Sequence, residues 1–262
     1  MSPPPVDVAA LAQRLATCRL ERVAGQGLTV DHPGLDLDAA YGVQEAGVRL
    51  LTDAGERLIG YKLGLTSRAK QRQMHVDEPL YGELTDAMLL DVGEPLVAAE
   101  HLQPRVEPEI AFLIGADLAG ERVGAAQVLA ATAAVTPALD VLDSRYAGYA
   151  FTLADVVADN ASAARLVLAG VRHPADRLDL RLVGCLLEVN GRLVATAAGA
   201  AALGHPAGAV AWLVRALARR GRGLTAGDIV LSGALTEAVA VAPGDVVLAS
   251  FDRIGTVELP VR

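Results

Sequence analysis

Two glutamates stand two positions apart at the start of an apolar segment in the middle of the chain. Glu107 and Glu109 precede residues 110–114, which are apolar, partly β-branched and typical of a buried strand. Residues i and i+2 of a strand point to the same face, so the two carboxylates are expected side by side. Burying them unpaired would cost on the order of several kcal/mol for each ion. A hard divalent cation with oxygen ligands, Mg²⁺ or Mn²⁺, would offset this cost.

The same two glutamates also fit a structural interpretation. In it they lie at a solvated strand edge, in water or paired with Arg105, because structural ion pairs give the same sequence pattern. Asp140 bears on the choice, since it lies between apolar neighbours on a second expected strand. A carboxylate in that position is a candidate third ligand for a hard cation.

Other polar residues interrupt apolar segments in ways that allow chemistry. Lys62 lies in an otherwise apolar strand candidate, residues 58–67, although lysine is rarely buried unpaired. It either contacts a substrate carboxylate or carbonyl, or is an edge lysine whose stem covers apolar surface. Ser162 either donates a hydrogen bond to a ligand or is a turn residue. Asp143 and Arg145 fit a structural ion pair, and His205, followed by proline, favours helix capping over a role as base.

Several reaction classes are excluded by missing motifs. The chain has no Gly-x-Ser-x-Gly elbow, no Walker loop and no Gly-x-Gly-x-x-Gly fingerprint where a Rossmann fold would need it. Cys18 and Cys185 are far apart, show no metal-ligand spacing and have no adjacent histidine pattern, which indicates free thiols in a reducing compartment. Oxygen-ligated metal chemistry is therefore favoured over nucleophile chemistry.

The composition limits the partners of the chain. The 262 residues are 52% hydrophobic and 21% charged, with a net charge of −8 and no basic run, which argues against nucleic-acid binding. The first residues lack the basic and apolar regions of a signal peptide. The apolar runs are interrupted well short of the roughly 20 residues that span a bilayer. We expect a soluble, cytoplasmic protein that binds neither nucleic acid nor membrane.

The expected elements describe one α+β domain. Apolar residues at three- and four-residue spacing predict helices at about 6–23, capped by Asp7, and 36–54. A helix up to Met74 and a turn at 77–82 are expected next. Further helices are expected at 124–134 and 207–219, with a short helix or turn at 151–157 and a hairpin around 190–191. Strands are expected at 58–67, 88–90, 95–97, 105–114, around 140, 165–168, 227–233, 243–248 and 255–261. The single domain covers 1–262, with an N-terminal helical region at 1–57 and a core at 58–262.

Six stretches, in this order, resemble one known family. They are residues 60–67 (GYKLGLTS), 77–82 (DEPLYG), 105–109 (RVEPE), 143–146 (DSRY), 158–162 (ADNAS) and 204–206 (GHP). The ordered set spans nearly the whole chain and resembles the 2-oxopent-4-enoate hydratase / 4-oxalocrotonate decarboxylase family of the fumarylacetoacetate hydrolase superfamily. The resemblance favours the metal interpretation of Glu107 and Glu109.

The resemblance implies a fold and a set of site residues. The fold is a mixed β-roll core of the fumarylacetoacetate hydrolase C-terminal-domain type with an N-terminal helical cap. The cofactor is Mg²⁺ or Mn²⁺ held by Glu107, Glu109 and Asp140, the last at a position where related hydratases and decarboxylases usually have glutamate. The motifs further assign catalytic roles to Lys62 and Asp77, and they assign substrate contacts to Lys62, Leu63, Arg145 and Ser162.

The resemblance implies a lyase acting on a short 2-oxo-enoate. A metal-polarised ketone could accept electrons when 4-oxalocrotonate (2-oxo-3-hexenedioate) loses its distal carboxylate as CO₂ through a dienolate. Hydration of 2-hydroxypenta-2,4-dienoate is the alternative reaction, and we favour decarboxylation. A third alternative is a weakly catalytic scaffold subunit for a partner hydratase. The expected partners are a 2-oxo acid, further copies of the chain and a related hydratase.

Overall fold

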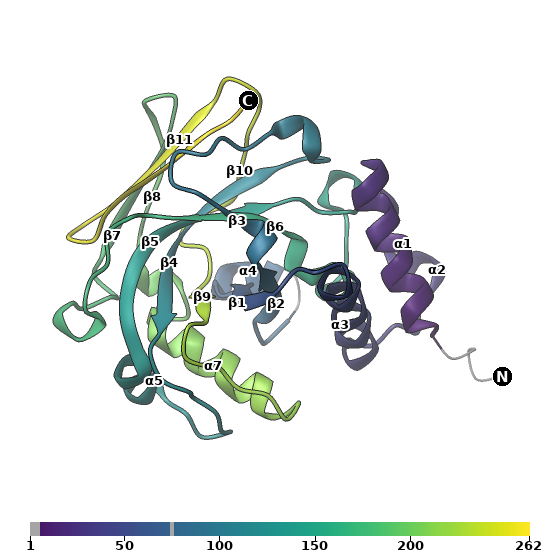
Figure 1. Cartoon of the computed structure of the whole chain (residues 1–262), viewed down its shortest axis with the longest axis horizontal. Coiled ribbons are helices and arrows are strands. Elements are labelled where there is room, and N and C mark those ends of the chain that lie inside the picture. Colours follow the sequence, from purple (N-terminus) through teal and green to yellow (C-terminus); the bar gives the residue numbers. More distant parts are fainter. Residues whose placement is uncertain (1–5, 74–75) are drawn as a thin grey trace.

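The protein is built around a large, strongly curled mixed sheet (Figure 1). The computed structural model describes residues 6–73 and 76–262. Its hydrogen-bonded path is β2-β1-β9-β4-β5-β6-β3, with β10 paired to β4. The pairs β1–β9 and β3–β6 are parallel, and the other pairs are antiparallel. The strand bounds are β1 Leu58–Gly64, β2 Leu80–Thr85, β3 Leu89–Leu90, β4 Arg105–Ile114, β5 Thr132–Leu142, β6 Ala163–Leu168, β9 Ile229–Leu231 and β10 Val239–Ala240.

A second, four-stranded antiparallel sheet packs against β5 with its strands β11 and β12. Its order is β12-β11-β7-β8, with bounds β7 Gly184–Val189, β8 Arg192–Ala198, β11 Val246–Phe251 and β12 Gly255–Pro260. The main apolar core fills the space between the sheets and helix α7, Pro206–Ala218, and is made of Val, Leu and Ala with a few aromatic rings. Helix α5, Ala125–Ala131, packs beside α7. The core is therefore filled mainly by small and medium-sized aliphatic side chains.

Helices α1, Val8–Glu21, and α3, Leu37–Asp53, form a layer at one end of the molecule (Figure 1). Both begin as expected, because the side chains of Asp7 and Asp36 accept hydrogen bonds from backbone N–H groups in the first turn. Helix α6, Leu153–Ala158, contacts both α3 and β2, and the short helix α2, Leu28–Asp31, contacts α6. A separate apolar cluster joins these helices to Leu80 and Tyr146.

Most expected elements are confirmed, and three are wrong. The expected strand at 95–97 is absent, because only Leu96 forms an isolated bridge, to Val261. Residues 80–82 are not a turn but the start of β2, where Gly82 has no room for a side chain because a Cβ would lie 2.6 Å from the Asn160 carbonyl oxygen. The alanine-rich helix ends at Ala131, and β5 begins at Thr132, where β-branched residues return. The short elements α2 and β10 were not expected from the sequence. Helix α4, Arg68–Gln73, is present, whereas the expected end at Met74 lies outside the described residues.

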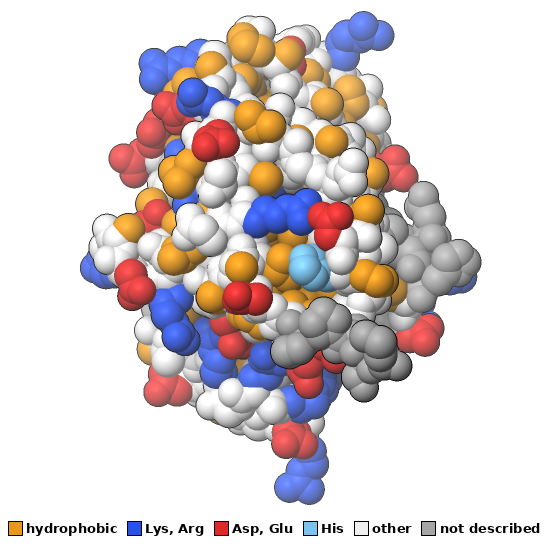
Figure 2. Space-filling view, turned by 90° about the vertical axis from the view of Figure 1, so that its right-hand side faces the viewer, with side chains coloured by type: hydrophobic (Ala, Val, Ile, Leu, Met, Phe, Trp, Pro, Cys, Tyr) orange, Lys and Arg blue, Asp and Glu red, His pale blue; other side chains and the backbone are white. Residues whose placement is uncertain are grey.

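The described surface carries charges of both signs. No helix in the described part of the chain is long and apolar enough to cross a membrane. Figure 2 shows acidic and basic side chains interspersed over the face that carries the N-terminal helices, rather than gathered into one basic patch. This mixed distribution fits the net charge of −8.

Candidate active site

Three buried carboxylates meet where β4 and β5 pair. Glu107 and Glu109 share one face of β4, and Asp140 on β5 lies directly opposite Glu107 in the antiparallel register. One carboxylate oxygen of each residue lies within 4.8 Å of the others. The side chains of Glu109 and Asp140 are fully buried, and that of Glu107 is nearly so. The structure therefore brings together the three residues predicted as ligands.

Lys62 supplies a buried positive charge beside this cluster. Its Nζ lies 2.5 Å from Asp140 Oδ2 and donates a hydrogen bond of 3.1 Å to the carbonyl oxygen of Ala161. Burial raises the pKa of Glu109 and of Asp140, and the positive charge of Lys62 opposes the rise in both. The negative charge of Asp140 adds to the increase at Glu109. One ammonium faces three carboxylates, so the cluster retains an excess of negative charge when they are ionised.

Two oxygen atoms of this cluster have neither a hydrogen-bond partner nor an ion-pair partner among the described residues. They are Glu109 Oε1 and Asp140 Oδ1, and both are buried away from solvent. Leaving buried acceptors unsatisfied costs about 1–3 kcal/mol each, more when they are charged. A donor set of carboxylate oxygens is what Mg²⁺ and Mn²⁺ prefer. The residues present therefore fit a divalent cation better than they fit a purely structural ion-pair network.

Backbone features of β1 and β9 place these groups. Gly60 has φ of 150°, and a Cβ there would lie 1.9 Å from the carbonyl oxygen of Ile229, so the close β1–β9 pairing requires glycine. At the end of β9, the N–H of Gly233 donates a hydrogen bond of 2.5 Å to Glu109 Oε2. Gly233 has φ of 106° and packs against Thr66, which leaves no space for a side chain. The loop after β9 thus orients Glu109.

A cavity of about 600 Å³ lies in front of the carboxylates. Lys62, Leu63, Glu107 and Ser162 line it, so four of the predicted site residues share one cavity. Apolar side chains cover much of the remaining wall. They are Leu65, Leu80, Leu142, Phe151, Val156 and Leu235. The wall is thus largely apolar with a few charged groups, as expected for a small-molecule site.

A strained turn forms one side of this cavity. Asn160, Ala161 and Ser162 have φ values of 52°, 53° and 55°, a left-handed conformation that costs about 1–3 kcal/mol for each non-glycine residue. The turn directs the Ala161 carbonyl to Lys62, while Asn160 exchanges hydrogen bonds with the backbone of Glu83. Ser162 Oγ lies 3.3 Å from Asp159 Oδ2 and lines the cavity. The position of Ser162 at the cavity is compatible with its predicted contact to substrate.

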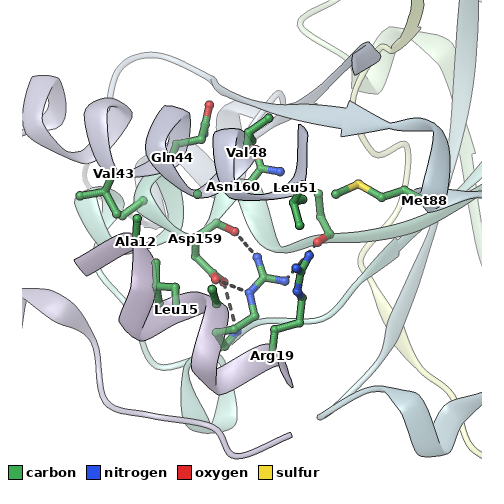
Figure 3. A pocket seen from close by; sticks show the side chains of 15 residues that line it. Ala12, Leu15, Arg19, Val43, Gln44, Val48, Leu51, Met88, Asp159 and Asn160 are labelled. Carbon is green, nitrogen blue, oxygen red and sulfur yellow. Dashed lines mark hydrogen bonds and ion pairs between the residues drawn. The ribbon is translucent and has the colours of Figure 1, made fainter. Parts of the chain in front are cut away.

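Arg145 does not line this cavity, in contrast to the prediction. Its guanidinium pairs with buried Asp159 and donates hydrogen bonds to the carbonyl oxygens of Asp143 and Ala163, at 2.7 Å and 3.1 Å. Asp159 and Arg19 lie in a separate small pocket between α1 and α3 (Figure 3). The guanidinium needs several acceptors when it is buried, and the 159–163 turn supplies them. Arg145 therefore stabilises the turn that carries Ser162 rather than facing the carboxylates.

Asp77 and Asp143 also lie away from the carboxylates. Asp77 is exposed and borders a different cavity, lined by Tyr41, Tyr81 and Trp212, so the structure does not bring it to the site. Asp143 accepts hydrogen bonds from the backbone N–H groups of Leu102 and Gln103, and it does not pair with Arg145 through its side chain. Asp143 therefore links the segment after β5 to the loop that precedes β4.

The sequence analysis missed two residues of the site. Gly233 contributes only a backbone N–H, which leaves no signal in a side-chain pattern. Arg105 was considered only as an ion-pair partner, yet it lines the cavity with its guanidinium 4.0 Å from the centre of the Tyr149 ring. Its spacing carried a signal, because positions 105, 107 and 109 share one face of a strand.

The core and the site together match one family model. Residues 57–262 match the family described as fumarylacetoacetate (FAA) hydrolase C-terminal. The chain belongs to this family. Its membership confirms the expected superfamily and, together with the curled mixed sheet, the expected fold class. The N-terminal helices α1–α3 precede the matched region.

Two curated relatives in this family carry different activities. A 4-oxalocrotonate decarboxylase of Pseudomonas sp. (strain CF600) is 40% identical over 251 residues, which cover 96% of this chain and 95% of the relative. A 2-keto-4-pentenoate hydratase of Paraburkholderia xenovorans (strain LB400) is 42% identical over 225 residues, covering 86% and 84%. Both relatives are lyases by their names, so the family resemblance inferred from the motifs is confirmed.

A solved structure shares the whole architecture, including the N-terminal helices. It is a 4-oxalocrotonate decarboxylase from Pseudomonas putida G7 complexed with magnesium and adipate, with a TM-score of 0.95, 37% identity and 97% of each chain covered. This structural similarity covers nearly the full length of the chain, so it includes both the FAA-hydrolase core and the N-terminal helices.

Proposed function

We propose that this protein is a divalent-metal-dependent lyase of short 2-oxo-enoates, and that its reaction is the decarboxylation of 4-oxalocrotonate. The observation that carries the proposal is the buried cluster of Glu107, Glu109 and Asp140, which has two partnerless oxygens and lies beside Lys62. Such a cluster at the base of a largely apolar cavity is hard to reconcile with a structural role alone, because it leaves buried acceptors unsatisfied.

Glu107, Glu109 and Asp140 would hold Mg²⁺ or Mn²⁺. The cation would supply Lewis-acid polarisation of a 2-oxo acid. In support, the Pseudomonas putida G7 decarboxylase was solved with magnesium, and a second structure of that enzyme was solved with calcium. The Gly233 N–H keeps one oxygen of Glu109 occupied, so its other oxygen remains available to a ligand.

The residues of the chain have defined tasks in this reaction. The bond between the distal carboxylate and the neighbouring carbon breaks, CO₂ leaves, and its electron pair moves through the conjugated system to the 2-oxo oxygen. The Lys62 ammonium, fixed by Asp140 and the Ala161 carbonyl, stabilises negative charge that develops near it. Apolar walls from Leu142, Phe151 and Val156 limit the access of water to the conjugated chain between the two ends of the substrate.

Decarboxylation is favoured over hydration by the structural match. Sequence coverage does not separate the two reactions, because the decarboxylase relative and a 2-keto-4-pentenoate hydratase of Burkholderia vietnamiensis (strain G4) each align with 96% of this chain. The whole-length structural match is to a decarboxylase solved with adipate, a six-carbon diacid. The specific observation for hydration of 2-hydroxypenta-2,4-dienoate is the 42% identity to the Paraburkholderia xenovorans hydratase, so hydration is the second candidate.

The assembly state forms part of the proposal. We infer that the protein forms homo-oligomers and associates with a related hydratase, since side chains of Leu186, Val194 and Val246 on the smaller sheet are 37–47% exposed to solvent. The third alternative, a weakly catalytic scaffold, predicts association without metal-linked substrate binding. Sedimentation of the protein alone and mixed with a hydratase measures both associations.

The deciding experiment compares two substrates with one preparation of enzyme and metal. CO₂ release from 2-oxo-3-hexenedioate and hydration of 2-hydroxypenta-2,4-dienoate are followed with Mg²⁺ and with Mn²⁺. We expect faster turnover of the diacid, with no activity after metal removal. Faster turnover of the dienoate without CO₂ from the diacid would favour the hydratase. Inactivity on both, with no binding of a 2-oxo acid linked to metal, would favour the scaffold.

A further inference from the structure

Arg105 occupies a special place on the strand that carries two of the three carboxylates. Residues two positions apart in a strand point to the same face. Arg105 therefore lies on the same face of β4 as Glu107 and Glu109. Exposure increases along this row, because Glu109 is fully buried, Glu107 is 8% exposed and Arg105 is half-buried. The row therefore leads from the buried carboxylates toward the solvent, with Glu107 and Arg105 in the wall of the cavity.

The guanidinium of Arg105 is held in place, but no carboxylate in the described part of the chain pairs with it. It lies over the ring of Tyr149, whose hydroxyl donates a hydrogen bond to the Gln103 carbonyl. Among the described residues, no carboxylate forms an ion pair with Arg105. A guanidinium stacked on an aromatic ring keeps its N–H donors available at its edge, where they match a carboxylate in a bidentate manner.

The cationic side chains that line the cavity differ in whether they can bind an anionic group of a ligand. Lys62 and Arg105 are the cations among the described lining residues, and Lys62 is engaged with Asp140. Glu107 belongs to the carboxylate cluster, and Glu237 is solvent-exposed at the rim. Arg105 is thus the cation in this part of the chain that can receive a second anionic group of a ligand bound at the cluster.

The spacing of the strand matches the length of a six-carbon diacid. Residues i and i+2 of a strand are about 6.6 Å apart. The two carboxyl carbons of an extended six-carbon diacid are also about 6 Å apart, from five C–C bonds of roughly 1.5 Å in a zigzag. A ligand whose 2-oxo acid end is at Glu107 and Glu109 can therefore extend along β4 and reach Arg105 with its other end.

We propose that Arg105 binds the distal carboxylate of a dicarboxylic 2-oxo acid and so makes the site selective for diacids over monoacids. This inference rests on the proposed function, since it assumes that the 2-oxo acid end binds at the carboxylate cluster. Arg105 is a specificity residue rather than an electron sink, because a cation on the departing carboxylate stabilises the bound substrate more than the transition state. Its loss should raise KM for the diacid much more than it lowers kcat.

The test uses two saturated 2-oxo acids of equal length, 2-oxohexanedioate and 2-oxohexanoate, which bind without turnover. Their affinities are measured by calorimetry in the presence of Mg²⁺ for the wild type, Arg105→Met, Arg105→Lys and Arg192→Met. The last variant removes one positive charge from an exposed position on β8 and serves as the matched control. Arg105→Gln replaces Arg105→Met if the latter does not fold. KM and kcat for CO₂ release from 2-oxo-3-hexenedioate are measured in parallel.

We expect Arg105→Met to bind the diacid roughly 10- to 100-fold more weakly, the range for losing a charge-assisted contact. Its affinity for the monoacid should change less than about twofold, Arg105→Lys should lie between, and Arg192→Met should match the wild type. Equal losses for both acids, an unchanged diacid affinity, or no diacid preference in the wild type would overturn the inference. A diacid preference that depends on Arg105 without any CO₂ release would instead reject the proposed reaction alone.

Discussion

At the scale of single residues, the site buries charged side chains that would each be unfavourable without the others. Asp140 neutralises Lys62, yet it also repels Glu109, and burial raises the pKa of both carboxyl groups. Asp140 is one methylene, about 1.5 Å, shorter than the glutamate that related enzymes were expected to have. Its position opposite Glu107 in the β4–β5 register still brings its oxygen within 4.8 Å of the other ligands.

Glu109→Gln is expected to abolish metal-linked stabilisation without loss of the fold. The amide keeps an oxygen for the Gly233 N–H and removes a repelling charge, so the melting temperature without metal should stay equal or rise. Saturating Mg²⁺ stabilises the wild type by about 2.7 kcal/mol when present at 100 times its Kd, but should not stabilise this variant. Glu258→Gln, at an exposed position of β12, is the control. A full Mg²⁺ shift in Glu109→Gln would show that Glu109 is no ligand.

Lys62→Ala is expected to lower kcat/KM by roughly 100- to 1,000-fold, the size expected for losing one charge-stabilising donor. Lys62→Arg should recover little of this loss, because a planar guanidinium cannot replace a compact ammonium in a fully buried position. Steady-state kinetics and thermal melts on the same samples separate the interpretations. Normal kinetics with a lowered melting temperature would make Lys62 a structural residue.

At the scale of elements, short-range backbone geometry holds the site. The β1–β9 pairing depends on Gly60, the loop after β9 orients Glu109, and the 160–162 turn fixes Lys62. The turn is itself held by the buried Arg145–Asp159 pair and its hydrogen bonds. These elements join groups that are far apart in the sequence.

The histidine that caps helix α7 should make the stability of the fold depend on pH. His205 is its N-cap, and His205 Nδ1 accepts a hydrogen bond of 3.0 Å from the Ala207 N–H. Burial and the charge of Arg181 lower the pKa of His205, while Asp179 opposes them. The unfolded chain therefore binds a proton more readily than the folded chain does. Stability should accordingly fall as the pH decreases through about 6.5, where an unfolded histidine titrates.

His205→Asn should reduce this pH dependence, because asparagine caps helices without titrating. Denaturant unfolding at pH 7.5 and 5.5 measures the difference between the two proteins. We expect the wild type to lose roughly 1 kcal/mol more than His205→Asn over this interval, about the contribution of one N-cap bond. Identical losses would indicate that His205 does not titrate on unfolding.

At the scale of the whole molecule, the N-terminal helices are continuous with the core. Leu11, Leu15 and Val43 pack in one buried cluster with Tyr146 and Val157. Gln44 of α3 also donates hydrogen bonds to the carbonyl oxygens of Tyr81 and Val157. Residues 6–57 thus cover the outer side of the turn that carries Ser162.

We therefore propose that residues 6–262 unfold as one domain. Calorimetry should show a single transition whose calorimetric and van't Hoff enthalpies agree. A chain that begins at residue 57 should expose the apolar surface of α6 and aggregate. A well-folded truncated protein, or two separate transitions in the full chain, would show that the helical region is an independent unit.

The sequence by itself determined features that depend on neighbouring residues, whereas the tertiary structure decided features that depend on contacts between distant segments. Local patterns determined the α1 and α3 caps, the strand carrying Glu107 and Glu109, and the family, because spacing and ordered motifs are properties of neighbouring residues. The burial of Lys62 against Asp140, the diversion of Arg145 to Asp159 and the opening of Arg105 into the cavity were decided by packing between distant segments. A buried charged residue pairs with the counter-charge that the fold places beside it. Since that partner lies far away in the sequence, a local sequence pattern cannot predict it.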